Sequence, residues 1–524
     1  MTQTDMIQQG KTCLGIEFGS TRIKAVLVDD SCVPLAAGSY DWENRYENGY
    51  WTYSLEDIHT GLQSCYASLA ADVKARYGVT LTTVGAIGIS AMMHGYLAFD
   101  AQDRLLVPFR TWRNTTTERA AAELSELLHF NIPQRWSIAH LYQAILNKEE
   151  HVPQIASVNT LAGYIHYRLT GRREVGVGEA SGIFPVEGNG YHPEYLRRAE
   201  EACRRHGFTQ SLSEVLPKVL LAGAKGAVLT EEGAAFLDPT GSLRAGVPLC
   251  PPEGDAGTGM VATNSVLPRT GNVSAGTSIF AMLVLEHALS GVYPEIDVVT
   301  TPDGAPVAMV HCNNCCSELD AWVKLFGEFA QLSGRPMDKS ALYETLYRNA
   351  LRGDADCGGV VAFNYLSGEP VTGLESGKPM YFRRAEGRFD LANFFRAELY
   401  SAMATLKLGM DILFEKERVA ADKFTGHGGL FKIEGVAQQF LADGLETPVA
   451  VMKTAGEGGA WGMAVLAAYM LWGGEASLPD YLENEVFVSM ESRTLAPDEA
   501  GSRGFAAFME NYRAGLPAEK LLAD

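Results

Sequence analysis

A short hairpin near the N-terminus combines the residue types that bind phosphate. Residues 14–29 read LGIEFGSTRIKAVLVD, two apolar strands joined by a Gly-Ser-Thr tip at 19–21, with Glu17 before the tip and Arg22 after it. Glycine lets the backbone bend, amide and hydroxyl groups can hold phosphate oxygens, and the carboxylate can reach Mg²⁺ or its waters. A plain hairpin with turn-forming residues is the alternative interpretation of this stretch.

A second stretch repeats this chemistry. Residues 272–284 read NVSAGTSIFAMLV and place a Gly-Thr-Ser tip at 276–278 between two apolar runs. Two such tips could close on one triphosphate from opposite sides. The pair therefore favours phosphate binding over a plain turn at both places.

Phosphoryl transfer also needs a group that takes the proton of the attacking hydroxyl. Asp255 lies in EGDAGTG between Gly254 and Gly257, and these glycines let backbone and substrate approach closely. A turn aspartate between glycines is the structural alternative.

A cysteine cluster offers a different chemistry. HCNNCC contains His311, Cys312, Cys315 and Cys316, a C-x2-C pair with a neighbouring histidine. Zinc sites normally use a second pair of ligands, and the next cysteine, Cys357, stands alone. We favour buried thiols over a metal site.

Composition limits the function classes. The 524 residues exceed what one core holds, which predicts two large domains. The net charge of 43 − 63 = −20 argues against a general nucleic-acid partner, because an acidic chain repels phosphate backbones. No segment is long and apolar enough for a membrane span, and the N-terminus lacks the apolar core of a secretory signal. Nine scattered cysteines indicate reduced thiols in a cytoplasmic protein.

Apolar periodicity predicts alternating strands and helices, which is typical of an α/β protein. The expected strands include 84–92, 272–284 and 306–312, and the expected helices include 55–78, 117–128, 141–150, 396–417 and 460–472. The repeated strand–turn–strand with a small-residue tip indicates duplicated α/β domains.

The chain resembles the FGGY carbohydrate kinases, which have the actin-like ATPase fold. The similarity is carried by GIEFGSTRIKAVLVD, ISAMMHGYLAFD (89–100), PFRTWRN (108–114), YIHYRLTGRREVGVGEASGIFPVE (164–187), PEGDAGTGMVATNSVLPRTGNVSAGTSIFAML (252–283), GHGGLFKIEGVAQQFLADGLETPV (426–449) and GEGGAWGMAVLAA (456–468). Their order and spacing together are specific. The resemblance implies two duplicated actin-like ATPase (ribonuclease H-like) domains with an interdomain cleft. The N-terminal domain, 1–258, would bind the sugar, and the C-terminal domain, 259–524, would bind most of the nucleotide.

The implied reaction transfers the γ-phosphoryl group of ATP, with Mg²⁺, to a sugar hydroxyl, and Asp255 would be the general base. The sugar-binding candidates are Met93, His94, Trp112, Asn114 and Asp255, and Glu17 would act on the metal directly or through water. The nucleotide-binding candidates are Gly19, Ser20, Thr21, Arg22, Gly276, Thr277, Ser278, Ser317, Gly428, Gly429 and Lys432. Glu179 and Ser181, in the GEAS stretch, would border the sugar pocket.

The sequence departs from the family pattern at two of these positions. Glu17 replaces the usual aspartate, and Asn114 replaces a common carboxylate. The Met-His-Gly at 93–95 favours a ketopentose such as xylulose. Ribulose, fuculose, glycerol or gluconate as acceptor, and an inactive actin-like ATP-binding regulatory protein, remain alternatives. The sequence does not fix the oligomeric state, and a homodimer is one state that it allows.

Overall fold

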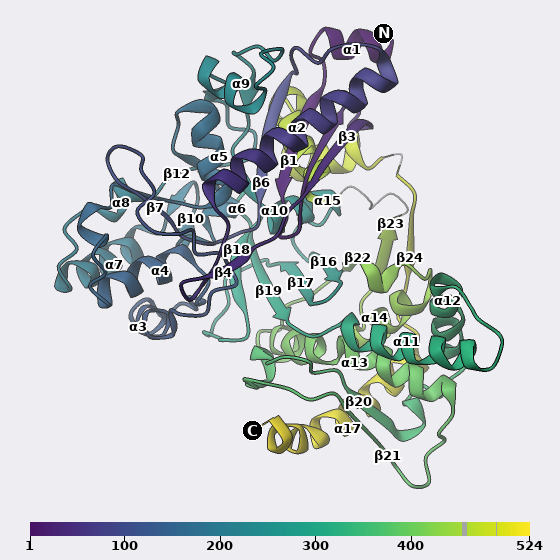
Figure 1. Cartoon of the computed structure of the whole chain (residues 1–524). Helices are drawn as coiled ribbons and strands as arrows, with labels where there is room; N and C mark the ends of the chain where they lie inside the picture. The colour runs from purple at the N-terminus through teal and green to yellow at the C-terminus, as the bar shows by residue number, and fades with distance from the viewer. Residues whose placement is uncertain (453–457, 489, 524) are drawn as a thin grey trace. The chain divides into compact units, whose positions relative to one another are not determined.

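The computed structural model describes residues 1–452, 458–488 and 490–523. The chain divides into two compact units, each with its own main sheet (Figure 1). Unit 1 comprises Met1–Val266, Val298–Val307 and Thr454–Met490, and unit 2 comprises Leu267–Asp297, Ala308–Lys453 and Glu491–Asp524. Among the described residues, no helix has both the length and the apolar character that crossing a membrane requires.

The unit 1 sheet combines an N-terminal hairpin with parallel strands. β1 (Cys13–Phe18) pairs antiparallel with β2 (Arg22–Val28) and parallel with β6 (Ala86–Ala91), and β15 (Glu253–Gly254) also runs parallel to β6. The main order is β13 (Ala227–Val228), β14 (Pro248–Leu249), β6, β1, β2 and β3 (Pro34–Asp41). Because β1, β6 and β15 are parallel, their carboxyl ends lie at one edge of the sheet. The segments that follow them carry the first hairpin tip, Met93 and Asp255.

Helices cover both faces of this sheet, so β1 and β6 are almost entirely buried. On one face lies α2 (Leu55–Tyr77), which begins after Ser54, whose hydroxyl accepts the Asp57 N–H at 3.0 Å. On the other lies α15 (Gly458–Trp472), an apolar helix from late in the sequence. A Cβ at Gly15 of β1 would lie 2.1 Å from the Ala460 oxygen, so glycine permits this close packing.

The unit 2 sheet repeats the same arrangement. β16 (Thr270–Ala275) pairs antiparallel with β17 (Ile279–Val284) and parallel with β22 (Lys423–His427). Within unit 2 the order is β19 (Pro306–Cys312, of which Ala308–Cys312 belongs to this unit), β17, β16, β22, β23 (Val449–Met452) and β24 (Ser492–Leu495). The two hairpins predicted from the sequence are therefore confirmed as β1–β2 and β16–β17, and the repeat indicates a duplicated fold.

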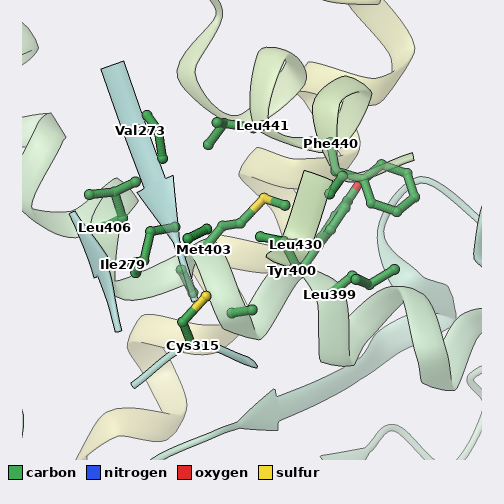
Figure 2. Close-up of a cluster of buried hydrophobic side chains, with 14 of the residues drawn as sticks. Val273, Ile279, Cys315, Leu399, Tyr400, Met403, Leu406, Leu430, Phe440 and Leu441 are labelled. Atoms are coloured by element: carbon green, nitrogen blue, oxygen red, sulfur yellow. The ribbon is translucent and has the colours of Figure 1, made fainter. Parts of the chain in front are cut away.

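The unit 2 core forms around α13 (Leu391–Asp411), which is buried along nearly its whole length. Figure 2 shows side chains of β16, β17, α13 and α14 (Val436–Leu445) gathered in this core, together with Cys315. The other long helices of this unit are α11 (Cys316–Leu332), α12 (Lys339–Ala350) and α17 (Glu499–Ala523).

Most expected elements are confirmed, but one helix is displaced. The helix expected at 141–150 is α4 (Ser137–Leu146) and follows α3 (Glu118–Leu128). It ends early because Lys148 adopts the left-handed conformation, with φ 53°. This turn lets Glu149 form an ion pair with the buried Arg110.

Candidate active site

Asp255 is the first residue of α10 (Asp255–Ala262) and follows β15 directly. The pairing of β15 with β6 brings it beside the segment that follows β6, where the Met93 N–H donates to Asp255 Oδ1 at 3.2 Å. A Cβ at Gly254 would lie 2.1 Å from Met93 Cγ. Glycine at 254 therefore lets the Asp255 segment approach the Met93 segment closely.

The surroundings of Asp255 make it a stronger base than an ordinary aspartate. Asp255 is exposed to solvent by surface area, although many protein atoms surround its carboxylate. This burial raises the pKa of Asp255 to about 6, against the opposing effect of the Met93 and Ala256 N–H groups. A carboxylate with this pKa is mostly ionised at neutral pH and holds a proton better than a free aspartate.

Glu17, at the carboxyl end of β1, is a second carboxylate in this region. Its side chain receives a hydrogen bond from the Ala460 N–H at the start of α15, and a Cβ at Gly459 would lie 2.1 Å from Glu17 Oε1. Burial raises the pKa of Glu17 to about 7, and the negative charge of Asp255 adds to the rise, whereas Lys24 opposes it.

The charge balance around Glu17 and Asp255 suits a divalent cation. Burial disfavours the ionised forms of both, and the charge of Asp255 further disfavours that of Glu17; a cation beside them would relieve both effects. Among the described residues, no group of three or more His, Cys, Asp or Glu side chains is arranged to hold a metal. Magnesium usually keeps several waters and is held by one or two carboxylates together with phosphate oxygens, so these two residues fit such an ion.

His94 adopts a strained backbone conformation, with φ 69°, directly after Met93. Its Nδ1 lies 3.1 Å from the Gly182 oxygen, and Arg135 Nε donates to its Nε2 at 3.3 Å. These contacts assign the proton to Nδ1 and describe a neutral imidazole. The ring is 5% exposed and stacks on Trp136. His94 is therefore held rigidly between the GEAS region and Arg135.

The Asn114 side chain forms hydrogen bonds with backbone groups of Trp51 and Thr111. Its Oδ1 accepts from the Trp51 N–H at 2.8 Å, and its Nδ2 donates to the Trp51 and Thr111 oxygens, both at 2.9 Å. Trp112, two residues earlier, is half-buried against the unit 1 core. The amide thus fixes the loop that carries Trp112.

The first hairpin tip is held through its carbonyl groups. Trp42 Nε1 donates to the Gly19 oxygen at 2.7 Å, and the Tyr53 hydroxyl donates to the Ser20 oxygen at 2.6 Å. The Trp42 N–H donates to the Thr21 oxygen at 3.1 Å, and the Trp42 and Tyr53 rings stack. A tip held in this way keeps a defined backbone shape, which an oxyanion site requires.

The second hairpin tip is held by the start of α11. The Cys316 N–H donates to the Gly276 oxygen, and the Cys315 N–H donates to the Thr277 oxygen, both at 3.0 Å. Within the tip, the Gly276 N–H donates to the Ser278 oxygen at 2.9 Å. Both tips are thus fixed by carbonyl contacts to neighbouring segments.

The glycine pair at 428–429 lies against this second hairpin. His427, the last residue of β22, is in register with Ser274 of β16. Gly428 follows with φ 99°, and a Cβ there would lie 2.3 Å from the Ala275 oxygen. The structure therefore brings together two candidate nucleotide segments that lie about 150 residues apart in the sequence.

The remaining candidates are accessible. Arg22 forms an ion pair with Asp41 across β2 and β3, and both side chains are exposed. Ser317 lies in the first turn of α11 and is half-buried, and Lys432 is exposed after the turn Gly429–Phe431. The Arg22 charge is thus shared with Asp41, whereas Lys432 is open to solvent.

Comparison with known protein families gives a match over most of the chain. Residues 12–261 match the N-terminal domain of the FGGY family of carbohydrate kinases, and residues 271–471 match its C-terminal domain. The chain belongs to the FGGY family of carbohydrate kinases. FGGY kinases use ATP as a substrate, so the chain is a carbohydrate kinase with a nucleotide site.

Similar proteins match this chain over nearly its whole length. The chain is 24% identical to the xylulose kinase of Haemophilus influenzae over 523 residues, which are 95% of this chain and 98% of that relative. A "xyloylose kinase" from Brucella ovis superposes with a TM-score of 0.77 at 20% identity, covering 98% of this chain and 100% of that one. A gluconate kinase from Lactobacillus acidophilus has the same TM-score at 16% identity, covering 97% and 99%. These likenesses establish the two-domain, actin-like ATPase fold of the FGGY kinases.

Sequence reasoning did not identify Glu253, which links two segments of this FGGY site. Its Oε2 accepts the Glu179 N–H at 2.8 Å, and its side chain fills the space that Cβ atoms at Gly176 and Gly178 would occupy. Burial raises the pKa of Glu253 to about 8. The contact with the Glu179 N–H joins the GEAS stretch to the strand that precedes Asp255. The one sign of this role in the sequence is a charged residue, Glu253, in the otherwise apolar run before Asp255.

We expect Gly428→Ala to weaken ADP binding by about tenfold or more. The substitution forces a side chain into a left-handed conformation and against the Ala275 oxygen, which must shift the second hairpin. Gly429→Ala is the matched control, because a Cβ there would lie 3.9 Å from the same oxygen, without a left-handed φ. Calorimetric titration with ADP measures both variants. Equal affinities for the two would contradict the packing argument.

Proposed function

We propose that this FGGY kinase transfers the γ-phosphoryl group of ATP to a hydroxyl of a ketopentose such as xylulose. The observation that carries the proposal is the hydrogen bond between Asp255 and the Met93 N–H, which holds a carboxylate of raised pKa beside the Met-His-Gly segment. The names of the similar xylulose kinases support the ketopentose.

On the sugar side, we assign 1–258 to sugar binding. Asp255 accepts the proton of the attacking hydroxyl and orients that hydroxyl. Met93 and Trp112 contact the apolar face of the sugar. His94, whose two ring nitrogens are paired with Gly182 and Arg135, borders the sugar site from its fixed position. Asn114 acts by holding the Trp112 loop, as its contacts with Trp51 indicate.

On the nucleotide side, we assign most contacts to 259–524. The two hairpin tips bind phosphate oxygens, and the glycine pair, Lys432 and Ser317 lie near the nucleoside. Arg22 adds positive charge at the first tip. Mg²⁺, when bound, would neutralise phosphate charge, and Glu17 holds it directly or through a water molecule.

A coupled assay of ADP release over an acceptor panel tests the function. The panel contains xylulose, ribulose, fuculose, glycerol and gluconate, because kinases for gluconate and glycerol also share the fold. Xylulose or another ketopentose should give the highest kcat/KM. Preference for gluconate or glycerol would overturn the ketopentose assignment, and ATP binding without any acceptor-stimulated release would overturn the transfer reaction.

We expect kcat/KM to fall as the pH decreases from about 7 to 5. Asp255, with a pKa of about 6, and Glu17, with a pKa of about 7, must both be ionised to act, and protonation removes their charge. A pH series with saturating ATP and Mg²⁺ measures the acid limb. A flat profile across this range would contradict the assigned role of both carboxylates.

We further propose that the enzyme acts in the cytoplasm. Its nine cysteines are all free thiols, and eight of them are buried. Free thiols persist in a reducing compartment.

A further inference from the structure

Two adjacent cysteines at the start of α11 form a close thiol pair that the proposed reaction does not use. Cys315 Sγ and Cys316 Sγ lie 3.5 Å apart, within reach of a sulfur–hydrogen contact. The two residues are consecutive in the chain. Their sulfur atoms are therefore placed to react with each other without bringing distant segments together.

The two thiols differ in access to solvent. Cys315 is 1% exposed and belongs to the unit 2 core (Figure 2), whereas Cys316 is half-buried. The other seven cysteines are buried. A small thiol reagent dissolved in water should thus reach Cys316 before any other cysteine, with Cys315 directly behind it.

The peptide bond between the two cysteines is part of the support of the second hairpin. Its N–H, on Cys316, donates to the Gly276 oxygen at 3.0 Å, and its oxygen, on Cys315, accepts from Asn364 Nδ2 at 3.1 Å. The Cys315 N–H donates to the Thr277 oxygen. A disulfide between adjacent cysteines closes a small ring that contains this planar peptide bond, and closing the ring must turn it.

The chain before the pair is firmly held, so a turned peptide bond acts on the hairpin. The Asn313 and Asn314 N–H groups donate to Glu369 Oε2 at 2.9 and 3.3 Å. Asn314 Oδ1 accepts from the Leu366 N–H at 2.9 Å. The tip at 276–278 is held on this side by the two N–H groups of the cysteine pair, so turning the peptide bond between them removes part of its support.

We propose that Cys315 and Cys316 are a redox modification site, which small disulfides oxidise to a vicinal disulfide that weakens nucleotide binding at the second hairpin. The inference rests on the proposed nucleotide role of Gly276, Thr277 and Ser278. Cytosolic disulfides are usually transient and regulatory, which suits a reversible pair of this kind.

The chemistry proceeds by two thiol–disulfide exchanges. The Cys316 thiolate, having released its proton to water, attacks one sulfur of the small disulfide, forms a mixed disulfide and expels one thiolate. The Cys315 thiol, whose pKa is raised by the neighbouring Cys316 thiol and by burial, then attacks Cys316 Sγ, and its proton passes to the departing sulfur, which leaves as the second small thiol. The proton released from Cys316 and the first expelled thiolate make the other small thiol. The protein pair is oxidised by two electrons, and the reagent is reduced by two.

Hydroxyethyl disulfide is the probe, and intact mass and ADP affinity are the two readouts. The treated full-length protein should lose two hydrogen atoms in mass and carry no reagent. Its affinity for ADP should fall by about tenfold and return after treatment with a reducing thiol. Cys315→Ala should keep the reagent bound at Cys316, because the second attacking thiol is missing.

Control variants separate the outcomes. Cys65→Ala removes a buried thiol of unit 1 and should respond as the unmodified chain does, whereas Cys316→Ser should lose the response of mass and affinity. Retained reagent on the unmodified chain, or an internal disulfide with unchanged ADP affinity, would overturn the inference. If the reduced protein binds no ADP, the proposed function is wrong, and so is the effect of the disulfide on nucleotide binding. The mass measurement still shows in that case whether the disulfide between Cys315 and Cys316 forms.

Discussion

Asp255→Asn is expected to lower kcat by at least about 10²-fold while ADP affinity stays unchanged. The asparagine keeps the shape and can still accept the Met93 N–H, but it cannot take a proton from the sugar hydroxyl. General-base assistance is typically worth about 10²–10⁴-fold, and the same carboxylate also orients the hydroxyl for in-line attack. Steady-state kinetics on the best acceptor of the panel, with calorimetry for ADP, measures both quantities.

Two comparisons show whether the loss is chemical. Asp255→Ala should also raise the sugar KM, because the orienting contact is lost. Asp100→Asn alters a buried aspartate that accepts from its own loop and from Arg104, so it should reduce stability and leave kcat unchanged. Near-normal turnover of Asp255→Asn, or its unfolding, would show that the glycine-flanked carboxylate is structural.

Glu17→Gln is expected to lower kcat by about 10–100-fold and to raise the Mg²⁺ concentration needed for half-maximal rate. Glutamine can still accept the Ala460 N–H, so the start of α15 stays in place, but the negative charge is gone. Losing a residue that holds a metal through its water typically costs about 10–100-fold in affinity or activity. The sugar KM should change little. Rates measured across a Mg²⁺ series at fixed sugar test this expectation.

Glu17→Asp is the matched control because it retains the charge and shortens the side chain. It should recover most of the Mg²⁺ response while losing the contact with the start of α15. If Glu17→Gln changes the sugar KM strongly and leaves the Mg²⁺ dependence normal, Glu17 binds the acceptor and the metal assignment is wrong.

Local sequence patterns predicted the framework of the site well. Gly-Ser-Thr and Gly-Thr-Ser between apolar runs predicted the hairpins β1–β2 and β16–β17, because glycine and small hydroxyl residues favour a turn between two strands. The fold class is confirmed, since the order and spacing of the motifs extend over most of the chain. The roles of Asp255, Glu17 and the other site residues remain predictions.

Contacts between segments distant in sequence could not be predicted. Nothing in the letters around His94 indicates that Arg135 would contact its Nε2, or that Gly182 would face its Nδ1. Asn114 looked like a substituted sugar ligand, and only the folded chain shows its contacts with Trp51. Such pairings depend on tertiary packing, which one sequence does not encode in any local pattern.

The late position of α15 in the chain bears on how the protein is made. This helix packs on Gly15 and Gly88 of the first sheet, yet the ribosome synthesises it only after most of unit 2. Until α15 (Gly458–Trp472) has left the ribosome, the glycine-lined face of β1 and β6 lacks its cover and exposes apolar surface to water. Unit 1 therefore completes its folding only after most of unit 2 has been synthesised. A nascent chain that stalls before this helix would be a substrate for chaperones or proteases.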